Sequence, residues 1–172
     1  MTSCLFTLCF AATTAAQNGT VTGVVTNSGT SAAVVDSFVT LCSNTGCSSA
    51  STASGSYSLS LPPDTYFAYT STPGRINLVD EIYNDIPCVG SCGDVVRTTG
   101  TPIVVTSGAT VTRDFALSPG GSIAGTVRST AGAAAPGVFV NVYVVGRTQF
   151  VKQTSTDSAG NFSIGGLPSG TY

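Results

Sequence analysis

The sequence contains no histidine and no tryptophan, and Glu81 is its only glutamate. Without histidine, a Ser-His-Asp triad, a histidine-ligated metal and the usual general base near neutral pH are all excluded. Abundant serine does not restore this chemistry, because no G-x-S-x-G motif occurs and a serine nucleophile would lack its base. We therefore expect a protein that is not an enzyme, with no catalytic residues, no cofactor and no metal site.

Charge is also scarce, at 8% of the 172 residues with a net charge of −2. An ordinary soluble domain has about 25% charged residues, so serine and threonine hydroxyls must supply much of the polar surface here. The six basic residues are scattered. They form no basic patch, and we expect neither nucleic acid nor an anionic membrane surface as a partner.

Residues that favour helices are few, whereas Val, Thr, Gly and Pro are frequent. β-Branched residues favour strands, and Gly and Pro favour turns. The composition therefore predicts an all-β protein. Its length permits one large domain or two small ones.

The first sixteen residues, MTSCLFTLCFAATTAA, differ in kind from the rest of the chain. A short apolar stretch over Cys4–Ala12 precedes small residues ending at Ala16, which is typical of a secretory leader. The stretch is too short to span a bilayer. The usual basic start is missing, so the alternative is the tail of an upstream domain. We predict a signal peptide or leader over 1–16 and a secreted or cell-surface location.

Four cysteines follow this segment: Cys42, Cys47, Cys88 and Cys92. An even number in an exported chain indicates disulfides. The segments CSNTGC and CVGSC each bracket turn residues, so local pairing is sterically feasible, and pairing between the two loops stays open. The gaps of four and three residues do not fit zinc ribbons, whose ligands usually lie two residues apart.

The sequence also repeats itself, because the residues from Thr20 onward align with those from Ser122 onward. Such self-similarity indicates two copies of one structural unit. The aligned pairs are Gly23 with Gly125, Phe38 with Phe139, Gly55 with Gly160, Tyr57 with Phe162, Leu61 with Leu167, Pro62 with Pro168, and Tyr66 with Tyr172.

The closing motif, TDSAGNFSIGGLPSGTY, combines turns with a core anchor. Asp157 is expected to cap a turn in which Gly160 takes a positive φ, and Phe162 then points into the core. Gly170 is expected to bend the chain, and Tyr172 to begin the next strand. These five residues are therefore predicted to have structural roles.

The first copy continues past Tyr66 into three further predicted strands, TYFAYTS, TPIVV and ATVTRDFAL. A unit of about one hundred residues with several short strands is typical of a β-sandwich. The second copy contains only the first half of this pattern. We predict a complete sandwich over 17–118 and an incomplete one over 119–172 that leaves apolar residues exposed.

The segments GGSIAGTV, PGVFVNVY and TDSAGNFSIGGLPSGTY together resemble the carboxypeptidase regulatory-like domain family. The resemblance implies tandem prealbumin-like (Ig-like) β-sandwiches, the second truncated, of the kind found in secreted bacterial multidomain proteins. It further implies a non-catalytic structural or adhesive accessory module. The implied partners are other domains beyond Tyr172 and cell-surface polysaccharide or protein. In the first copy Asp64 stands where the family pattern has glycine.

A related branch, the Cna-B-type pilin and adhesin domains, forms Lys–Asn cross-links within each domain. Lys152 is the only lysine in this sequence, so a cross-link of that kind is excluded in the first unit and is not expected in the second.

The alternative function is carbohydrate binding by aromatic side chains. If Tyr66 and Ala68 face the core, strand alternation places Phe67 and Tyr69 on the outer sheet face, where they could stack on sugar rings. The competing interpretation is that the segment 72–100 folds back over both rings.

Half of the acidic residues gather in the segment VDEIYNDIPCVGSCGD. Clustered carboxylates can bind calcium, but no EF-hand spacing is present, and two carboxylates for glycosidase chemistry would need a cleft. A solvated acidic loop held by Cys88 and Cys92 is the plainer interpretation.

Overall fold

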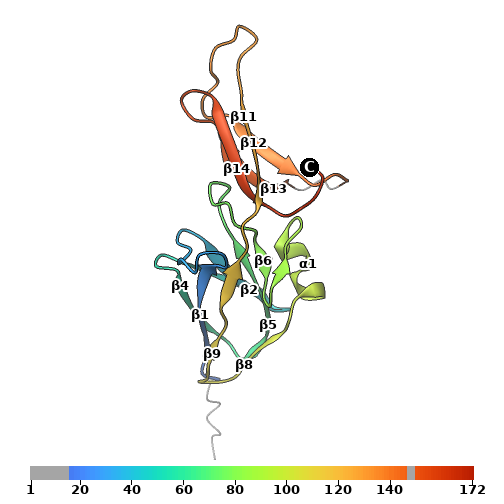
Figure 1. The fold of residues 1–172 in the computed structure, drawn as a ribbon. Helices are drawn as coiled ribbons and strands as arrows, with labels where there is room; N and C mark the ends of the chain where they lie inside the picture. The colour runs from blue at the N-terminus through green and yellow to red at the C-terminus, as the bar shows by residue number, and fades with distance from the viewer. Residues whose placement is uncertain (1–15, 147–149) are drawn as a thin grey trace, which may run out of the picture.

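Strands dominate the computed structural model of this protein, which describes residues 16–146 and 150–172. Figure 1 shows two units, one beyond the other along the long direction of the molecule. The larger unit contains β1 to β10 and one helix, and the smaller unit contains β11 to β14. Except for Ala16, the predicted leader lies outside the described residues.

The first sheet of the larger unit has four strands: β1 (Gly19–Asn27), β4 (Ser56–Leu61), β9 (Thr110–Thr112) and β10 (Phe115–Leu117). β1 is central, antiparallel to β4 on one side and parallel to β9 and then β10 on the other. The sequence predicts one strand through β9 and β10. The structure divides it at Asp114, whose Oδ1 accepts the Val24 backbone N–H at 2.9 Å. This N–H would otherwise donate to a backbone carbonyl of the neighbouring strand.

The second sheet has six strands: β2 (Phe38–Cys42), β3 (Cys47–Ser51), β5 (Asp64–Ser71), β6 (Glu81–Ile82), β7 (Ile86–Pro87) and β8 (Ile103–Val105). Their order is β3-β2-β5-β6-β7, and β8 also pairs with β5. All neighbours are antiparallel.

One hydrophobic core lies between the two sheets of the larger unit. Strand residues at alternate positions point inward and build this core. They are Val21, Val25, Val39, Leu41, Tyr57, Leu61, Tyr66, Ala68, Ile103, Val105, Phe115 and Leu117. Each large side chain buried in this way stabilises the fold by about 1.5–3 kcal/mol. The larger unit is therefore a β-sandwich.

The helix α1 (Cys92–Thr99) departs from the all-β prediction. Half of its residues are valine or threonine, which are weak helix formers, so sequence propensity alone does not indicate a helix. Burial holds it instead, because Val96 is fully buried against the second sheet. Asp94 in the first turn and Arg97 in the last turn also suit the helix dipole. Within residues 16–146 and 150–172, no helix is long and apolar enough to cross a membrane.

The smaller unit consists of two antiparallel pairs, β11 (Gly121–Thr126) with β14 (Asn161–Leu167) and β12 (Phe139–Tyr143) with β13 (Phe150–Ser155). Among its described residues, three buried apolar side chains form a small core: Val142, Ile164 and Leu167. Several large apolar side chains remain exposed, namely Ile123, Val138, Phe139, Tyr143 and Val145.

Particular contacts of the larger unit recur in the smaller one. A threonine hydroxyl donates to a backbone carbonyl in each unit: Thr52 to Val34 at 2.8 Å, and Thr156 to Ala135 at 2.6 Å. A tyrosine hydroxyl donates to a carbonyl four residues earlier in each: Tyr66 to Pro62, and Tyr172 to Pro168. A glycine with positive φ directly precedes a strand in each unit: Gly55 (φ +82°) before β4 and Gly160 (φ +78°) before β14.

Candidate functional site

The outer face of the second sheet carries the two aromatic residues predicted to contact carbohydrate. Tyr66 and Ala68 are buried in the core, and Phe67 and Tyr69 point to the opposite face, as strand alternation predicts. Both outer rings are half-buried and pack beside Val96 of α1. The segment 72–100 therefore does fold back over them, which is the competing interpretation of the sequence.

Two disulfides lie on this same side of the sheet. Cys42 pairs with Cys47 across the β2–β3 turn, and Cys88 pairs with Cys92 at the start of α1. Of the three pairings that the sequence allows, the structure has the local one in both loops. Cys42, Cys88 and Cys92 belong to the hydrophobic cluster that includes Phe67 and Tyr69. The disulfides therefore help to hold the segment 72–100 in place over these two rings.

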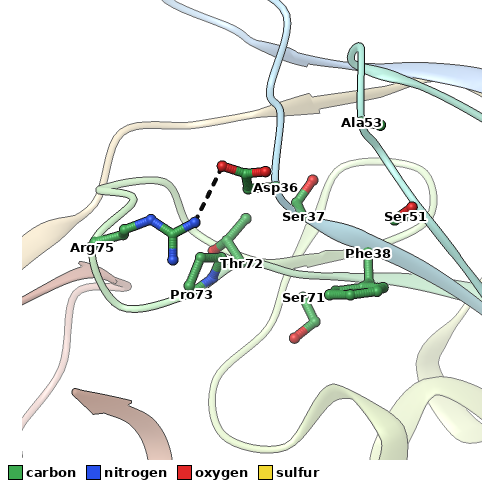
Figure 2. Close-up of a pocket in the computed structure, with 9 residues that line it drawn as sticks. All are labelled: Asp36, Ser37, Phe38, Ser51, Ala53, Ser71, Thr72, Pro73 and Arg75. Carbon is green, nitrogen blue, oxygen red and sulfur yellow. Dashed lines mark hydrogen bonds and ion pairs between the residues drawn. The ribbon is translucent and has the colours of Figure 1, made fainter. Parts of the chain in front are cut away.

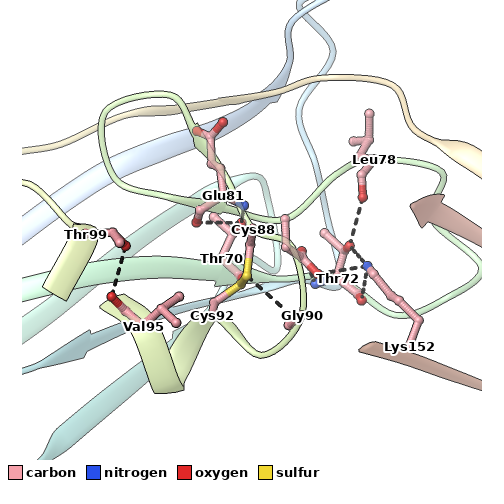
Figure 3. Close-up of a disulfide and its surroundings, with 11 residues drawn as sticks. Thr70, Thr72, Leu78, Glu81, Cys88, Gly90, Cys92, Val95, Thr99 and Lys152 are labelled. Atoms are coloured by element: carbon pink, nitrogen blue, oxygen red, sulfur yellow. Dashed lines mark hydrogen bonds and ion pairs between the residues drawn. A yellow bond between two sulfur atoms is a disulfide. The ribbon is translucent and has the colours of Figure 1, made fainter. Parts of the chain in front are cut away.

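The junction between the units contains a buried lysine. Lys152, on β13 of the smaller unit, reaches the larger unit and is only 5% exposed. Its Nζ lies 2.8 Å from Asp80 Oδ2 and donates to the Thr72 carbonyl at 2.8 Å and to the Thr72 hydroxyl. Figure 3 shows the contacts of Lys152 with Thr72 beside the Cys88–Cys92 disulfide. All three ammonium protons thus have partners across the junction.

The Asp80 carboxylate is held from both units. Besides Lys152, it accepts the Thr72 backbone N–H at 2.7 Å through Oδ1. Burial raises the pKa of Asp80, and the positive charge of Lys152 and the hydrogen bonds from Lys152 and Thr72 oppose that rise. Because the charged lysine supports the charged carboxylate, we treat the two as an ion pair.

Backbone contacts continue the junction on either side of this pair. The Gly165 N–H donates to the Gly74 carbonyl at 2.7 Å. Asn77 binds the smaller unit twice, because its side-chain oxygen accepts the Gly166 N–H at 2.8 Å and its carbonyl accepts the Gly120 N–H at 3.2 Å. The 72–80 loop of the larger unit therefore forms most of the surface that receives the smaller unit.

The remaining acidic residues of this segment do not gather into a site. Glu81 is buried, and burial together with the negative charges of Asp85 and Asp80 raises its pKa to about 7. Asp94 lies in the first turn of α1. Among the described residues, no group of three or more His, Cys, Asp or Glu side chains is arranged to hold a metal ion.

A groove that sequence reasoning missed lies at the uncovered end of the same outer face. Phe38 opens β2, its ring is half exposed, and strand register places it between Ser51 of β3 and Ser71 of β5. Asp36 and Arg75 form an ion pair at the rim, with Arg75 Nη2 3.3 Å from Asp36 Oδ2 (Figure 2). We call this surface, about 550 Å³ in volume, the Phe38 groove.

One signal in the sequence could have indicated this groove. The alternation that places Phe67 and Tyr69 outward also places Phe38 on the same face, since Phe38 and Ser71 are paired across β2 and β5. Which of these rings is covered depends on the path of residues 72–100, and that path is not visible in strand periodicity.

The residues of the closing motif have structural positions. Asp157 Oδ1 accepts the backbone N–H groups of Ala159 and Asn161, each at 2.8 Å, and these bonds lower the pKa of Asp157. Phe162 packs on the small core. Gly170 lies in a bend, as predicted.

Tyr172, expected to begin the next strand, is the last residue of the given sequence and lies outside the described strands. Its ring packs against the small core. Its hydroxyl donates to the Pro168 carbonyl, as the hydroxyl of Tyr66 within β5 donates to the Pro62 carbonyl.

Comparison with known families identifies part of the chain. Residues 122–172 match the carboxypeptidase regulatory-like domain. The predicted resemblance is therefore confirmed for this segment, and it stays a prediction for the first copy. No curated protein matches the chain.

Three solved structures align with most of this chain at low similarity. The Bacillus anthracis TIE protein is 15% identical with a TM-score of 0.44, over 86% of this chain and 26% of that one. A streptococcal ancillary pilin is 13% identical with a TM-score of 0.37, over 88% and 51% of the two chains. A DUF3823 family protein from Parabacteroides merdae is 9% identical with a TM-score of 0.40, over 87% and 80%. The chain thus spans about a quarter of the first protein and half of the second.

Proposed function

We propose, from the match of residues 122–172 to the carboxypeptidase regulatory-like domain, that this chain is a non-catalytic accessory module. In this proposal its two units act as one rigid spacer within a secreted or cell-surface bacterial multidomain protein. The partners that it would position are other domains of the same polypeptide and, for an adhesive role, cell-surface polysaccharide or protein.

The observation that carries the proposal is the buried Lys152–Asp80 pair. Interfaces between domains of one chain are commonly polar and permit relative motion. Here the lysine is 5% exposed and has a partner for every proton. If the units reoriented, the two charges would stay buried without partners, or they would become exposed and lose their hydrogen bonds to Thr72. Either change is unfavourable, so the ion pair favours one orientation of the units.

The short connection between the units supports the same proposal. Only Ser118, Pro119 and Gly120 separate β10 from β11. The Val79 N–H donates to the Ser118 carbonyl at 2.8 Å, and Pro119 forms a bridge with Leu78. A proline-containing connection of this length, bonded to the larger unit, gives little freedom to the smaller one.

We further propose that the units are two copies of one design, with boundaries at 17–118 and 119–172. The recurring hydrogen bonds of Thr52 and Thr156 support this division. In the larger unit β1 pairs with β9 and β10 on the side away from β4. In the described part of the smaller unit β11 pairs with β14 alone. In a complete second sandwich, a further strand would pair with the edge of β11 that faces away from β14.

The disulfides support the proposed location. Structural disulfides persist in oxidising compartments and are rare in the cytosol. With Cys42 paired to Cys47 and Cys88 paired to Cys92, all four cysteines of the larger unit are used in this way. An exported protein is the expected context.

Carbohydrate binding through Phe67 and Tyr69 receives no support from the geometry. Both rings are half-buried in a cluster with Val96 and the cysteines of the second disulfide. We therefore do not assign these residues to a ligand site.

Nuclear magnetic resonance relaxation of the whole chain tests the rigid-spacer proposal. If the units tumble as one body, backbone ¹⁵N relaxation in both will fit a single rotational diffusion tensor. Lys152→Met should give the units separate tensors, whereas Arg75→Met, which removes an exposed cation from the same 72–80 loop, should not. Independent tumbling of the units in the unaltered chain would contradict the proposal.

A further inference from the structure

The Phe38 groove has the composition of a ligand site rather than of a packing defect. It combines an aromatic ring, which is 51% exposed, with the hydroxyls of Ser51 and Ser71 on the neighbouring strands. Its volume of about 550 Å³ lies in the range of small-molecule sites, which pair apolar surface with a few placed polar groups. Phe38 is more exposed than Phe67 and Tyr69, which are partly buried in the cluster that includes Val96 of α1.

The ion pair at the rim contributes little to the fold. The side chains of Asp36 and Arg75 are each about two-thirds exposed, at 67% and 65%. Exposed ion pairs of this kind have small effects on stability. Their presence beside an exposed ring is better explained by a ligand that needs both a hydrogen-bond acceptor and a donor.

The backbone at Asp36 supports a role for its carboxylate. Asp36 has a φ of +58°, a region that glycine adopts far more easily. Gly137, the residue two positions before Phe139 in the second copy, stands at the equivalent place with a φ of +70°. The first unit thus has an aspartate at a position where the second unit has a glycine in a similar backbone conformation. Strained residues of this kind occur preferentially at functional positions.

The charge of the groove restricts the ligand. The positive charge of Arg75 and the negative charge of Asp36 cancel at 3.3 Å, so the groove favours neither an anion nor a cation. A neutral ligand with several hydroxyl groups would use both, because its hydroxyls can donate to the carboxylate and accept from the guanidinium. An apolar face on the same ligand would cover the ring of Phe38.

We propose that the Phe38 groove binds a pyranose ring of a neutral polysaccharide. The apolar face of the sugar lies on Phe38, its hydroxyls bind Asp36 and Arg75, and Ser51 and Ser71 bind the adjoining hydroxyls. This inference does not depend on the rigid spacer, because every residue of the groove belongs to the larger unit.

The test is a titration of the ¹⁵N-labelled whole chain, followed through backbone amide chemical shifts. The probes are four neutral oligosaccharides, cellohexaose, xylohexaose, mannohexaose and chitohexaose, with hexagalacturonate as the acidic comparison. We expect saturable shifts at Phe38, Ser51 and Ser71 with at least one neutral probe. Absence of saturable shifts with all four neutral probes, or saturation with hexagalacturonate alone, would overturn the proposal.

Three variants complete the test. Phe38→Ala should weaken binding of the neutral probe by about tenfold or more, as expected for loss of a central aromatic contact. Phe139→Ala is the matched control, because it removes the aligned and even more exposed ring of the second unit and should leave binding unchanged. Asp36→Gly should weaken binding by a similar factor without lowering the unfolding temperature, since glycine suits this φ. Equal affinity in Phe38→Ala and the unaltered chain would sink the proposal.

Discussion

Lys152 of the smaller unit and Asp80 of the larger unit form an ion pair with 2.8 Å between Nζ and Oδ2. The residues are far apart in the sequence, because Lys152 lies on β13 and Asp80 lies in the loop just before β6. A buried pair of this kind is costly to break, because the partner left behind is a buried charge without compensation. The pair therefore couples the orientation of the two units to the stability of the chain.

Removing one member of this pair should destabilise the protein strongly. Lys152→Met is expected to lower the free energy of unfolding by about 3–5 kcal/mol, the range measured for broken buried pairs. The double variant Lys152→Met with Asp80→Asn should recover most of the loss, since neither residue is then charged. Urea unfolding followed by circular dichroism measures both.

The exposed pair at the Phe38 groove is the matched control for this prediction. Arg75→Met should change the free energy of unfolding by about 1 kcal/mol or less, as expected for an exposed ion pair. A loss of the same size in Arg75→Met and Lys152→Met would mean that burial is not the source of the effect.

Stability should also depend on the protonation of Glu81. Its pKa in the folded protein is about 7 against an ordinary 4.5, so the folded state holds the proton more tightly than the unfolded state. The free energy of unfolding should therefore fall as the pH rises from about 4.5 to about 7. Glu81→Gln should reduce this fall, and unfolding measured at several pH values checks it.

Asp85→Asn provides the control for the pH prediction. Asp85 is exposed in the same segment, so its replacement removes a carboxylate while leaving Glu81 free to titrate. Because the charge of Asp85 contributes to the raised pKa of Glu81 but burial contributes more, most of the decline in stability should persist in Asp85→Asn. An equal reduction of the decline in both variants would contradict the assignment to Glu81.

The recurring threonines should have similar effects in the two units. Thr52→Val and Thr156→Val each remove a buried hydroxyl that donates to a backbone carbonyl and accepts a backbone N–H. Each should destabilise its unit by about 1–3 kcal/mol, the usual result of leaving a buried polar group without its partner. Hydrogen exchange of amides near each site locates the effect, and a neutral outcome in one unit alone would argue against a shared design.

The disulfides should contribute through chain entropy. Closing a loop of five or six residues stabilises the fold by about 2 kcal/mol in the loop-entropy account. Replacing both Cys88 and Cys92 with serine should also loosen α1, and more than the same change at Cys42 and Cys47, because Cys92 is itself the first residue of α1. Thermal unfolding and hydrogen exchange of α1 separate these effects. Mass spectrometry of the unaltered protein should find no free thiol among Cys42, Cys47, Cys88 and Cys92, and two free thiols among these four would contradict the structure.

Strand periodicity predicted the local features well. The alternation of Tyr66 and Ala68 against Phe67 and Tyr69 is observed, because side-chain direction in a strand is fixed by the backbone. The turn at Asp157 and Gly160 is observed for a similar reason, since its bonds lie within five residues. Both depend on chemistry that is contained in a short segment.

Features that depend on distant segments could not be predicted from the sequence. α1 forms from weak helix formers because the second sheet buries Val96. Lys152 gave no signal of its role, since its partners Thr72 and Asp80 come from a loop of the other unit. The Phe38 groove was missed because periodicity does not reveal which part of a sheet face another segment will cover.

The distance distribution between the two units tests the central claim most directly. Spin labels on Ser58→Cys and Thr130→Cys, both exposed and in different units, can be measured by double electron–electron resonance in a chain whose Cys4 and Cys9 are replaced by serine, so that they take no label. We predict one narrow distribution, which broadens in Lys152→Met and stays narrow in Arg75→Met. A broad distribution in the chain that retains Lys152 would contradict a rigid two-unit module.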